Sequence, residues 1–124
     1  MIDEGRALFL QIAEQIEDSI VDGSLPEETQ APSTNELAAF HRINPATAAK
    51  GVNLLVESGI LYKRRGVGMF VAPGARDALL ARRRAAFAES YVRPLLIEAA
   101  RLGLGASDVA ELIHSQTPTE GDRS

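Results

Sequence analysis

The chain has 124 residues, of which 45% are hydrophobic, so it can bury one modest core with a short appendage. It has no cysteine, no run of about 18 apolar residues and no export signal, which argues against disulfides, thiolate metal sites, membrane spans and secretion. We therefore expect a cytoplasmic protein without a membrane partner, a structural metal or a cofactor.

The net charge of −4 is unevenly distributed along the chain. Residues 1–36 hold nine acids and one base, whereas residues 41–84 hold nine bases and two acids, a local net charge of +7. Such segregation arises either by chance on a solvated surface or in a polarised molecule that presents one face to a polyanion. We favour the second interpretation.

Two helices are predicted in the N-terminal third. An apolar residue recurs at every fourth position from Leu8 to Ile20, which is the stripe of an amphipathic helix, and Gly23 ends it. After a polar connection, Ser33 and Glu36 match the S-x-x-E capping box, in which each side chain bonds the backbone N–H of the other residue. A short second helix therefore begins there.

A third helix follows a turn at residues 41–43, since Asn44 can cap it and Pro45 suits the first helical position. Its two faces differ in character. The face expected to be buried carries Ala48, Val52 and Leu55 with Gly51 and Leu54 beside them, and the opposite face carries Ala46, Lys50, Asn53 and Glu57.

Residues 60–71 predict a β-hairpin whose turn region, KRRGVG, is basic and rich in glycine. Arg64 and Arg65 can follow phosphates or enter a minor groove, with Gly66 and Gly68 allowing a close approach. The alternative is an exposed hairpin whose charges protect a sheet edge from pairing with another strand.

Two short helices joined by a tight turn and followed by a basic hairpin are the parts of a winged helix-turn-helix. A helix that enters the major groove, about 12 Å wide, needs small or polar side chains at its leading turn. Ala46 and Thr47 can offer methyl groups to thymine, and Lys50 can reach a guanine edge or a phosphate. The alternative is that residues 46–49 are merely good helix formers. Spacing and charge together favour double-stranded DNA as the partner.

Beyond the hairpin, a helical pattern covers residues 75–102, and Pro94 should kink or break it. Gly103 and Gly105 end it, and a short helix is predicted over residues 106–114. The apolar residues of this tail that we expect at a dimer contact are Leu80, Phe87, Tyr91, Leu95, Leu102 and Leu112. A helical hairpin of this size cannot bury them alone, so they pack either on the chain's own winged domain or on a second subunit. We favour a homodimer.

The stretches FLQIAEQIEDSIVDGSL, APSTNELAAFHRINPATAAKGVNLLVESGIL and KRRGVGMFV together resemble the GntR family of bacterial transcription regulators. The later stretch EAARLGLGASDVAELI is similar to the short tail of its YtrA-like group. The resemblance implies a winged-helix DNA-binding domain that works as a homodimer on a roughly palindromic operator, usually as a repressor. It also implies a small helical dimerisation tail without a large effector domain.

The sequence departs from the family pattern at several positions. Asn35 stands where the P-S-x-R-E-L-A pattern usually has an arginine that contacts DNA. Glu27 and Glu28 replace the usual Pro-Gly of the loop before the second helix and bring acid near the expected DNA face. Three smaller departures are Ala48, Gly51 and Met69, in place of the usual Val, Ala and Thr. These changes bear on affinity and operator sequence rather than on shape.

We therefore expect a mostly α fold with a small β-hairpin: a winged helix-turn-helix domain over residues 1–73, a helical dimerisation tail over 74–114 and disorder over 115–124. The expected DNA-binding residues are Ser33, Thr34, Asn35, Asn44, Ala46, Thr47, Lys50, Arg64, Arg65, Gly66 and Gly68.

An enzyme is not expected, because no glycine-rich phosphate loop follows a strand and no histidine lies with a plausible nucleophile. The alternative function is a winged-helix protein-interaction module without specific DNA binding, which the acidic N-terminal third and Asn35 favour. A small-molecule sensor would need a pocket between the tail and the winged domain, and the sequence identifies no effector.

Overall fold

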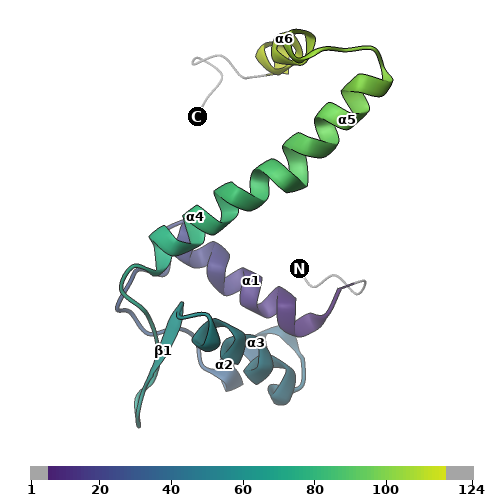
Figure 1. Ribbon diagram of the computed structural model, residues 1–124. Helices are drawn as coiled ribbons and strands as arrows, with labels where there is room; N and C mark the ends of the chain where they lie inside the picture. The colour runs from purple at the N-terminus through teal and green to yellow at the C-terminus, as the bar shows by residue number, and fades with distance from the viewer. Residues whose placement is uncertain (1–5, 117–124) are drawn as a thin grey trace. The chain divides into compact units, whose positions relative to one another are not determined.

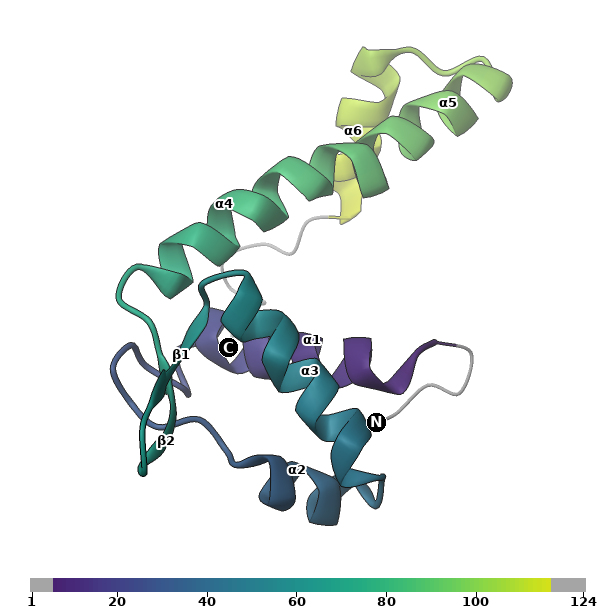
Figure 2. The ribbon, with the colours of Figure 1, turned by 60° about the horizontal axis from the view of Figure 1, so that its bottom comes forward.

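The computed structural model describes residues 6–116, which are mostly helical with one β-hairpin midway along the chain (Figure 1, Figure 2). The first five elements are α1 (Leu8–Val21), α2 (Thr34–His41), α3 (Pro45–Glu57), β1 (Leu61–Arg64) and β2 (Gly68–Val71). The elements that follow are α4 (Ala75–Phe87), the π-helical segment η1 (Ala88–Val92), α5 (Arg93–Arg101) and α6 (Ala106–Gln116). The predicted fold class is confirmed.

The starts of α2 and α3 have the predicted caps. The Ser33 hydroxyl accepts from Glu36 N, and Glu36 Oε1 accepts from Ser33 N, so both halves of the capping box are present. Asn44 is the N-cap of α3, its Oδ1 accepts from Ala46 N, and Pro45 is the first residue of the helix. The hydrogen bond from Ser33 N–H lowers the pKa of Glu36. The box is therefore intact above the ordinary carboxyl range and weakens only as pH falls through the lowered pKa.

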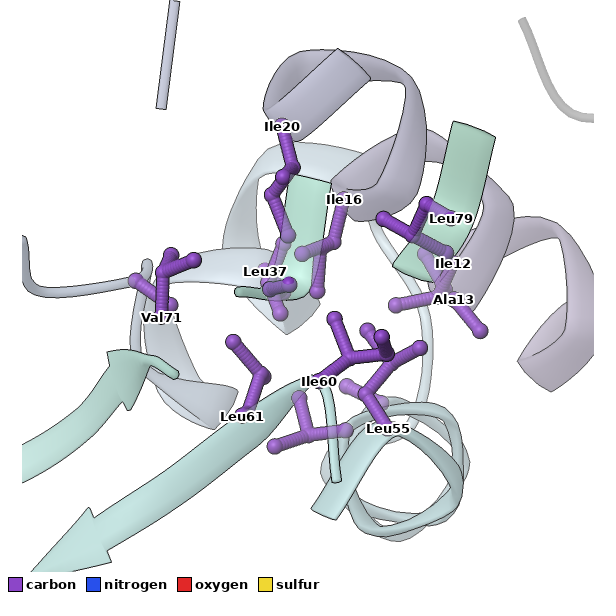
Figure 3. Close-up of a cluster of buried hydrophobic side chains, with 14 of the residues drawn as sticks. Ile12, Ala13, Ile16, Ile20, Leu37, Leu55, Ile60, Leu61, Val71 and Leu79 are labelled. Atoms are coloured by element: carbon purple, nitrogen blue, oxygen red, sulfur yellow. The ribbon is translucent and has the colours of Figure 1, made fainter. Parts of the chain in front are cut away.

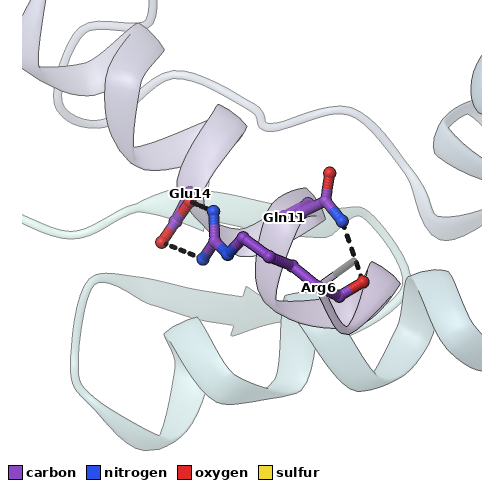
Figure 4. Close-up of polar contacts among 3 residues, drawn as sticks. All are labelled: Arg6, Gln11 and Glu14. Carbon is purple, nitrogen blue, oxygen red and sulfur yellow. Dashed lines mark hydrogen bonds and ion pairs between the residues drawn. The ribbon is translucent and has the colours of Figure 1, made fainter. Parts of the chain in front are cut away.

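The N-terminus of α1 has no side-chain cap at Ala7, and polar contacts from Arg6 and Gln11 surround it instead (Figure 4). The Arg6 guanidinium forms two hydrogen bonds with the Glu14 carboxylate, at 2.9 and 2.7 Å. The buried Gln11 amide donates to the Arg6 carbonyl at 3.0 Å. These contacts hold the chain that enters α1 against the helix.

The core lies between α1, α2, α3, the hairpin and the first turns of α4 (Figure 3). α1 contributes the predicted stripe, since Ile12, Ile16 and Ile20 are buried together. The other core residues are Ala13, Ala31, Leu37, Ala38, Ala48, Val52, Leu55, Ile60, Leu61, Val71, Ala75 and Leu79. The base of the hairpin, at Leu61 and Val71, therefore packs on the helices.

Helices α1 and α3 approach closely at Gly51. A Cβ atom at this position would lie 2.7 Å from the Phe9 carbonyl oxygen and 3.1 Å from the Ile12 side chain. Glycine therefore permits a spacing of these two helices that a larger residue would prevent.

We call the β-hairpin of residues 61–71 the wing; a third segment of the chain is hydrogen-bonded along its edge. β1 and β2 pair antiparallel, with Tyr62 opposite Phe70. The loop before α2 runs along β2, where Gln30 forms an isolated bridge with Phe70, and Ala31 N–H donates to the Met69 carbonyl. Glu28 N–H donates to the Val71 carbonyl at 2.8 Å. These hydrogen bonds connect the wing to the segment that leads into α2.

The chain divides into two compact units, the first ending at Arg82 and the second beginning at Arg83. The first two turns of α4 belong to the first unit, because Ala75 and Leu79 are only 2% and 1% exposed within its core. The side chain of Glu27 accepts from Gly74 N–H and Arg76 N–H and so caps the start of α4.

The predicted disturbance near Pro94 takes the form of a π-helical segment. η1 occupies the five residues before α5, and Pro94 is the second residue of α5. Proline lacks an N–H and its ring crowds the carbonyl four residues earlier, so a wider turn at this point relieves both problems. The expected break does not occur, because η1 continues directly into α5.

The second unit has a very small core, in which Ala99 of α5 and Val109 of α6 are buried. Gly103, at φ 74°, ends α5, and Asp108 accepts from Gly105 N–H at the start of α6. Ser115 and Gln116, which we expected to be disordered, form the last turn of α6, where the Ser115 hydroxyl donates to the Leu112 carbonyl. The rest of the segment predicted as disordered, 117–124, lies outside the described residues.

Candidate nucleic-acid interface

The two faces of α3 are divided as the sequence predicts. Its buried residues are Ala48, Gly51, Val52 and Leu55, and its exposed residues include Ala46, Lys50, Asn53 and Glu57. Thr47 is half-buried. The first turns of the helix therefore present methyl groups and one cation to solvent, without a bulky side chain that would block entry into a major groove.

Lys50 has a contact that the sequence pattern did not reveal. Its ammonium nitrogen lies 4.0 Å from the centre of the Phe9 ring, which belongs to the first turn of α1. Such a contact attracts the cation to the ring face but leaves it charged. Phe9 therefore holds a positive charge beside the exposed face of α3.

Some predicted DNA-binding side chains already have structural roles. The side-chain oxygens of Ser33 and Asn44 serve as helix caps. Thr34 is half-buried at the start of α2, whereas Asn35 is exposed. Ser33 and Asn44 are exposed too, but their side chains serve as caps, whereas Asn35 is exposed without a capping role.

The tip of the wing is formed by residues 65–67, between the two strands. Gly66 has φ 76° and Gly68 has φ 144°, conformations that favour glycine. The Gln30 amide donates to the Val67 carbonyl at 2.9 Å and so braces the tip from the loop before α2. Arg65 is exposed at this tip.

Arg64, by contrast, has several partners on the wing. Its guanidinium carbon lies 4.0 Å from the centre of the Phe70 ring, and its Nη2 donates to the Tyr62 hydroxyl at 3.0 Å. The Tyr62 hydroxyl in turn donates to Glu28 Oε1 at 2.7 Å, and Glu28 Oε2 lies 4.0 Å from Arg64 Nη2. We call these four residues, Glu28, Tyr62, Arg64 and Phe70, the wing cluster.

Part of the wing cluster had a signal in the sequence. Residues two apart on a strand share a face, so the sequence predicts that Tyr62 and Arg64 lie side by side. The partners of Glu27 and Glu28, the two acids in place of Pro-Gly, have no signal in the sequence. The structure separates them: Glu27 binds the start of α4, and Glu28 binds the wing.

The predicted dimerisation residues fall into two groups. Leu80 is half-buried in the first unit. The others are exposed in the second unit, namely Phe87 at 58%, Tyr91 at 68%, Leu95 at 46%, Leu102 at 64% and Leu112 at 50%. The Phe87 and Tyr91 rings adjoin, with centroids 5.6 Å apart.

Three of these residues share a hollow of about 290 Å³ within the second unit. We call it the tail groove; its lining includes Leu95, Ala99, Leu102, Leu104, Val109, Leu112 and Ile113. Glu98 and Gln116 also line it, but its surface is almost entirely apolar, and the groove is open to solvent in the single chain.

Other classes of site find little support in the described part of the chain. Within residues 6–116, no three His, Cys, Asp or Glu side chains are grouped so that they could hold a metal ion. None of the helices in the same range combines the length and apolarity that crossing a bilayer requires.

Comparison with known proteins places this geometry among bacterial regulators. The family model described as bacterial regulatory proteins, gntR family, matches residues 8–71, which include α1 to β2. The transcriptional repressor YtrA of Bacillus subtilis is 26% identical over 106 residues, covering 86% of this chain and 81% of YtrA.

Two solved structures extend the comparison. A protein assigned as a GntR-family transcriptional regulator from Bacteroides thetaiotaomicron has a TM-score of 0.74 and 29% identity, over 88% of this chain and 95% of its own. The DNA-binding domain of AraR, solved in complex with operator ORR3, has a TM-score of 0.50 and 33% identity, over 52% of this chain and 77% of its own.

Proposed function

The chain belongs to the GntR family of bacterial regulatory proteins, and we propose that it represses transcription as a homodimer bound to a palindromic operator. Membership makes it a DNA-binding transcriptional regulator rather than an enzyme. Repression, the dimer and the operator symmetry are the proposed part. They are supported by the similarity to the repressor YtrA and to the AraR domain that binds an operator.

The observation that carries the proposed mode of DNA binding is the exposed leading face of α3. Ala46 and Lys50 point away from the core side of this helix, while Ala48 and Val52 anchor it. In a helix-turn-helix, the N-terminal residues of the second helix contact base edges. We therefore assign base recognition to α3, phosphate contacts to the start of α2, and backbone or minor-groove contacts to the wing tip at Arg65.

The observation that supports a dimer is that the second unit exposes many more large hydrophobic residues than it buries. Ala99 and Val109 are its buried hydrophobic residues among those described. Eight large hydrophobic residues of this unit are exposed, namely Phe87, Tyr91, Leu95, Leu96, Ile97, Leu102, Leu112 and Ile113. Exposed apolar surface of this kind usually marks an association site. A second copy that offers the same surface covers both, as a two-fold interface requires.

The proposed division of labour follows from these two observations. Residues 1–73 supply the winged DNA-binding domain, with the first turns of α4 packed into its core, and the tail through residue 114 supplies the dimer contact. A dimer fixes two α3 helices relative to each other. In the commonest arrangement they meet the same side of the duplex about 34 Å apart, one helical turn.

Lys50→Ala is expected to weaken binding to an operator selected from a random pool of duplexes by about 1 to 3 kcal/mol, because one cationic contact to a base or phosphate is lost. Fluorescence anisotropy on a labelled operator duplex measures the change. Phe9→Leu is the matched control: it removes the ring beneath the ammonium and keeps the charge. Equal losses of affinity in both variants would mean that the effect of Lys50→Ala comes from its packing on Phe9 rather than from a DNA contact.

The competing function is a winged-helix module that binds protein. It predicts weak binding to duplex DNA with little dependence on salt, whereas phosphate contacts make binding steeply dependent on salt. The same anisotropy titrations at two or more salt concentrations distinguish the two functions.

A further inference from the structure

The wing cluster places a carboxylate beside a cation that DNA would otherwise use. Arg64 lies over the Phe70 ring, and the Tyr62 hydroxyl links it to Glu28. The arginine thus has a cation–π contact, a hydrogen bond and a nearby negative charge within the wing itself. Any phosphate that approaches the guanidinium must compete with this arrangement.

The interaction between Glu28 and Arg64 is weak enough for a DNA phosphate to replace it. The Arg64 and Glu28 side chains are 46% and 53% exposed, and exposed ion pairs contribute little to stability. A DNA phosphate is also anionic and releases counterions when it is bound. Glu28 can therefore reduce the contribution of Arg64 to DNA binding without abolishing it.

The backbone at position 28 points to a role for the side chain. Glu28 has φ 66°, a conformation that glycine adopts without strain and that strains residues with a side chain. Its N–H bonds the Val71 carbonyl, which holds the residue at the base of the wing. Glycine would meet the backbone requirement better, so a glutamate here brings a carboxylate to the wing at the expense of local strain.

Arg65 provides an internal comparison. It follows Arg64 directly but lies at the tip, beyond the end of β1, and none of the described side chains forms an ion pair with it. The two neighbouring arginines therefore differ in what they are free to bind.

We propose that Glu28 is an affinity-setting residue that competes with DNA phosphate for Arg64, so that Arg65 makes the wing's main phosphate contact in the native protein. This inference rests on the proposed DNA-binding function and deepens it. Its consequence is weaker, less salt-dependent binding than the number of basic residues on the wing would predict.

The test is the salt dependence of binding to a duplex of arbitrary sequence, measured by anisotropy with the full chain. Glu28→Gln should steepen the plot of log affinity against log salt by about 0.9 per protomer, because one more phosphate contact forms. Glu27→Gln is the matched control, since it removes the same charge one residue away but contacts the start of α4. Equal slopes in the two variants would overturn the inference.

A double-mutant cycle isolates Arg64 from general charge effects. In the native background, Arg64→Ala should change the slope by much less than Arg65→Ala does. In the Glu28→Gln background, Arg64→Ala should remove the whole gain in slope. A gain that survives the loss of Arg64 would also overturn the inference.

The native chain separates the two possible failures. If it does not bind duplex DNA at all, the proposed function fails. If it binds DNA while Glu28→Gln and Glu27→Gln behave alike, only the role of Glu28 fails.

Discussion

Leu102→Asp should convert the protein from a dimer to a monomer at micromolar concentration and weaken binding to a two-half-site operator by about 100-fold or more. Leu102 is 64% exposed in the single chain and lines the tail groove. A charge buried there in a dimer interface would be desolvated without a partner. Loss of the dimer then removes the contact with the second half-site. Linking two binding sites raises affinity by about 10² to 10⁴-fold, and the monomer loses this gain.

Sedimentation of the native and variant chains measures the first step, and anisotropy on the operator measures the second. Ser107→Asp is the control, because it adds the same charge to an exposed polar position in the first turn of α6. A Leu102→Asp chain that still sediments as a dimer, or a native chain that is monomeric at this concentration, would refute the assignment of the tail.

Leu79→Ala is expected to lower the free energy of unfolding by about 2 to 5 kcal/mol, as removal of a fully buried leucine side chain does. Leu79 is 1% exposed in the core of the first unit, although it lies in α4, beyond the hairpin. Urea denaturation at one fixed protein concentration gives the change.

The adjacent Leu80 is the control for this change. It is the same residue type on the same helix but is half-buried, so Leu80→Ala should cost clearly less. If the two variants lose equal stability, α4 does not share the core of the winged unit, and a cut directly after the hairpin would leave that unit intact.

Features with local signals were predictable from the sequence. The Ser33–Glu36 capping box, the Asn44 cap and the division of α3 into two faces each depend on residues within a few positions of one another. The hairpin likewise follows from two short apolar runs on either side of a basic, glycine-rich turn. In these segments, local preference and tertiary packing require the same structure.

The wing cluster was not predictable in this way, because Glu28 meets Tyr62 and Arg64 across more than thirty residues of sequence. No local pattern states which of two neighbouring acids turns toward the wing. The contact between Lys50 and Phe9 likewise depends on how closely α1 approaches α3, which Gly51 permits.

The tail shows how an irregular helix misleads a periodic pattern. A fixed helical spacing groups Leu80 with the residues from Phe87 onward. η1 lies after Phe87, and a π-helical turn holds more residues than an α-helical one, so the phase of the stripe shifts between Phe87 and Leu95. Earlier in α4, Leu79 lies in the core of the first unit, and the half-buried Leu80 belongs to the same unit.

Sequence-specific DNA recognition by α3 can be tested by selecting, from a random pool, the duplexes that the full chain binds. We expect enrichment of an inverted repeat whose half-sites are centred about one helical turn apart, bound about 10³-fold or more tighter than arbitrary DNA at physiological salt. Recovery of no common sequence, or of duplexes bound no better than the starting pool, would contradict sequence-specific DNA recognition by α3.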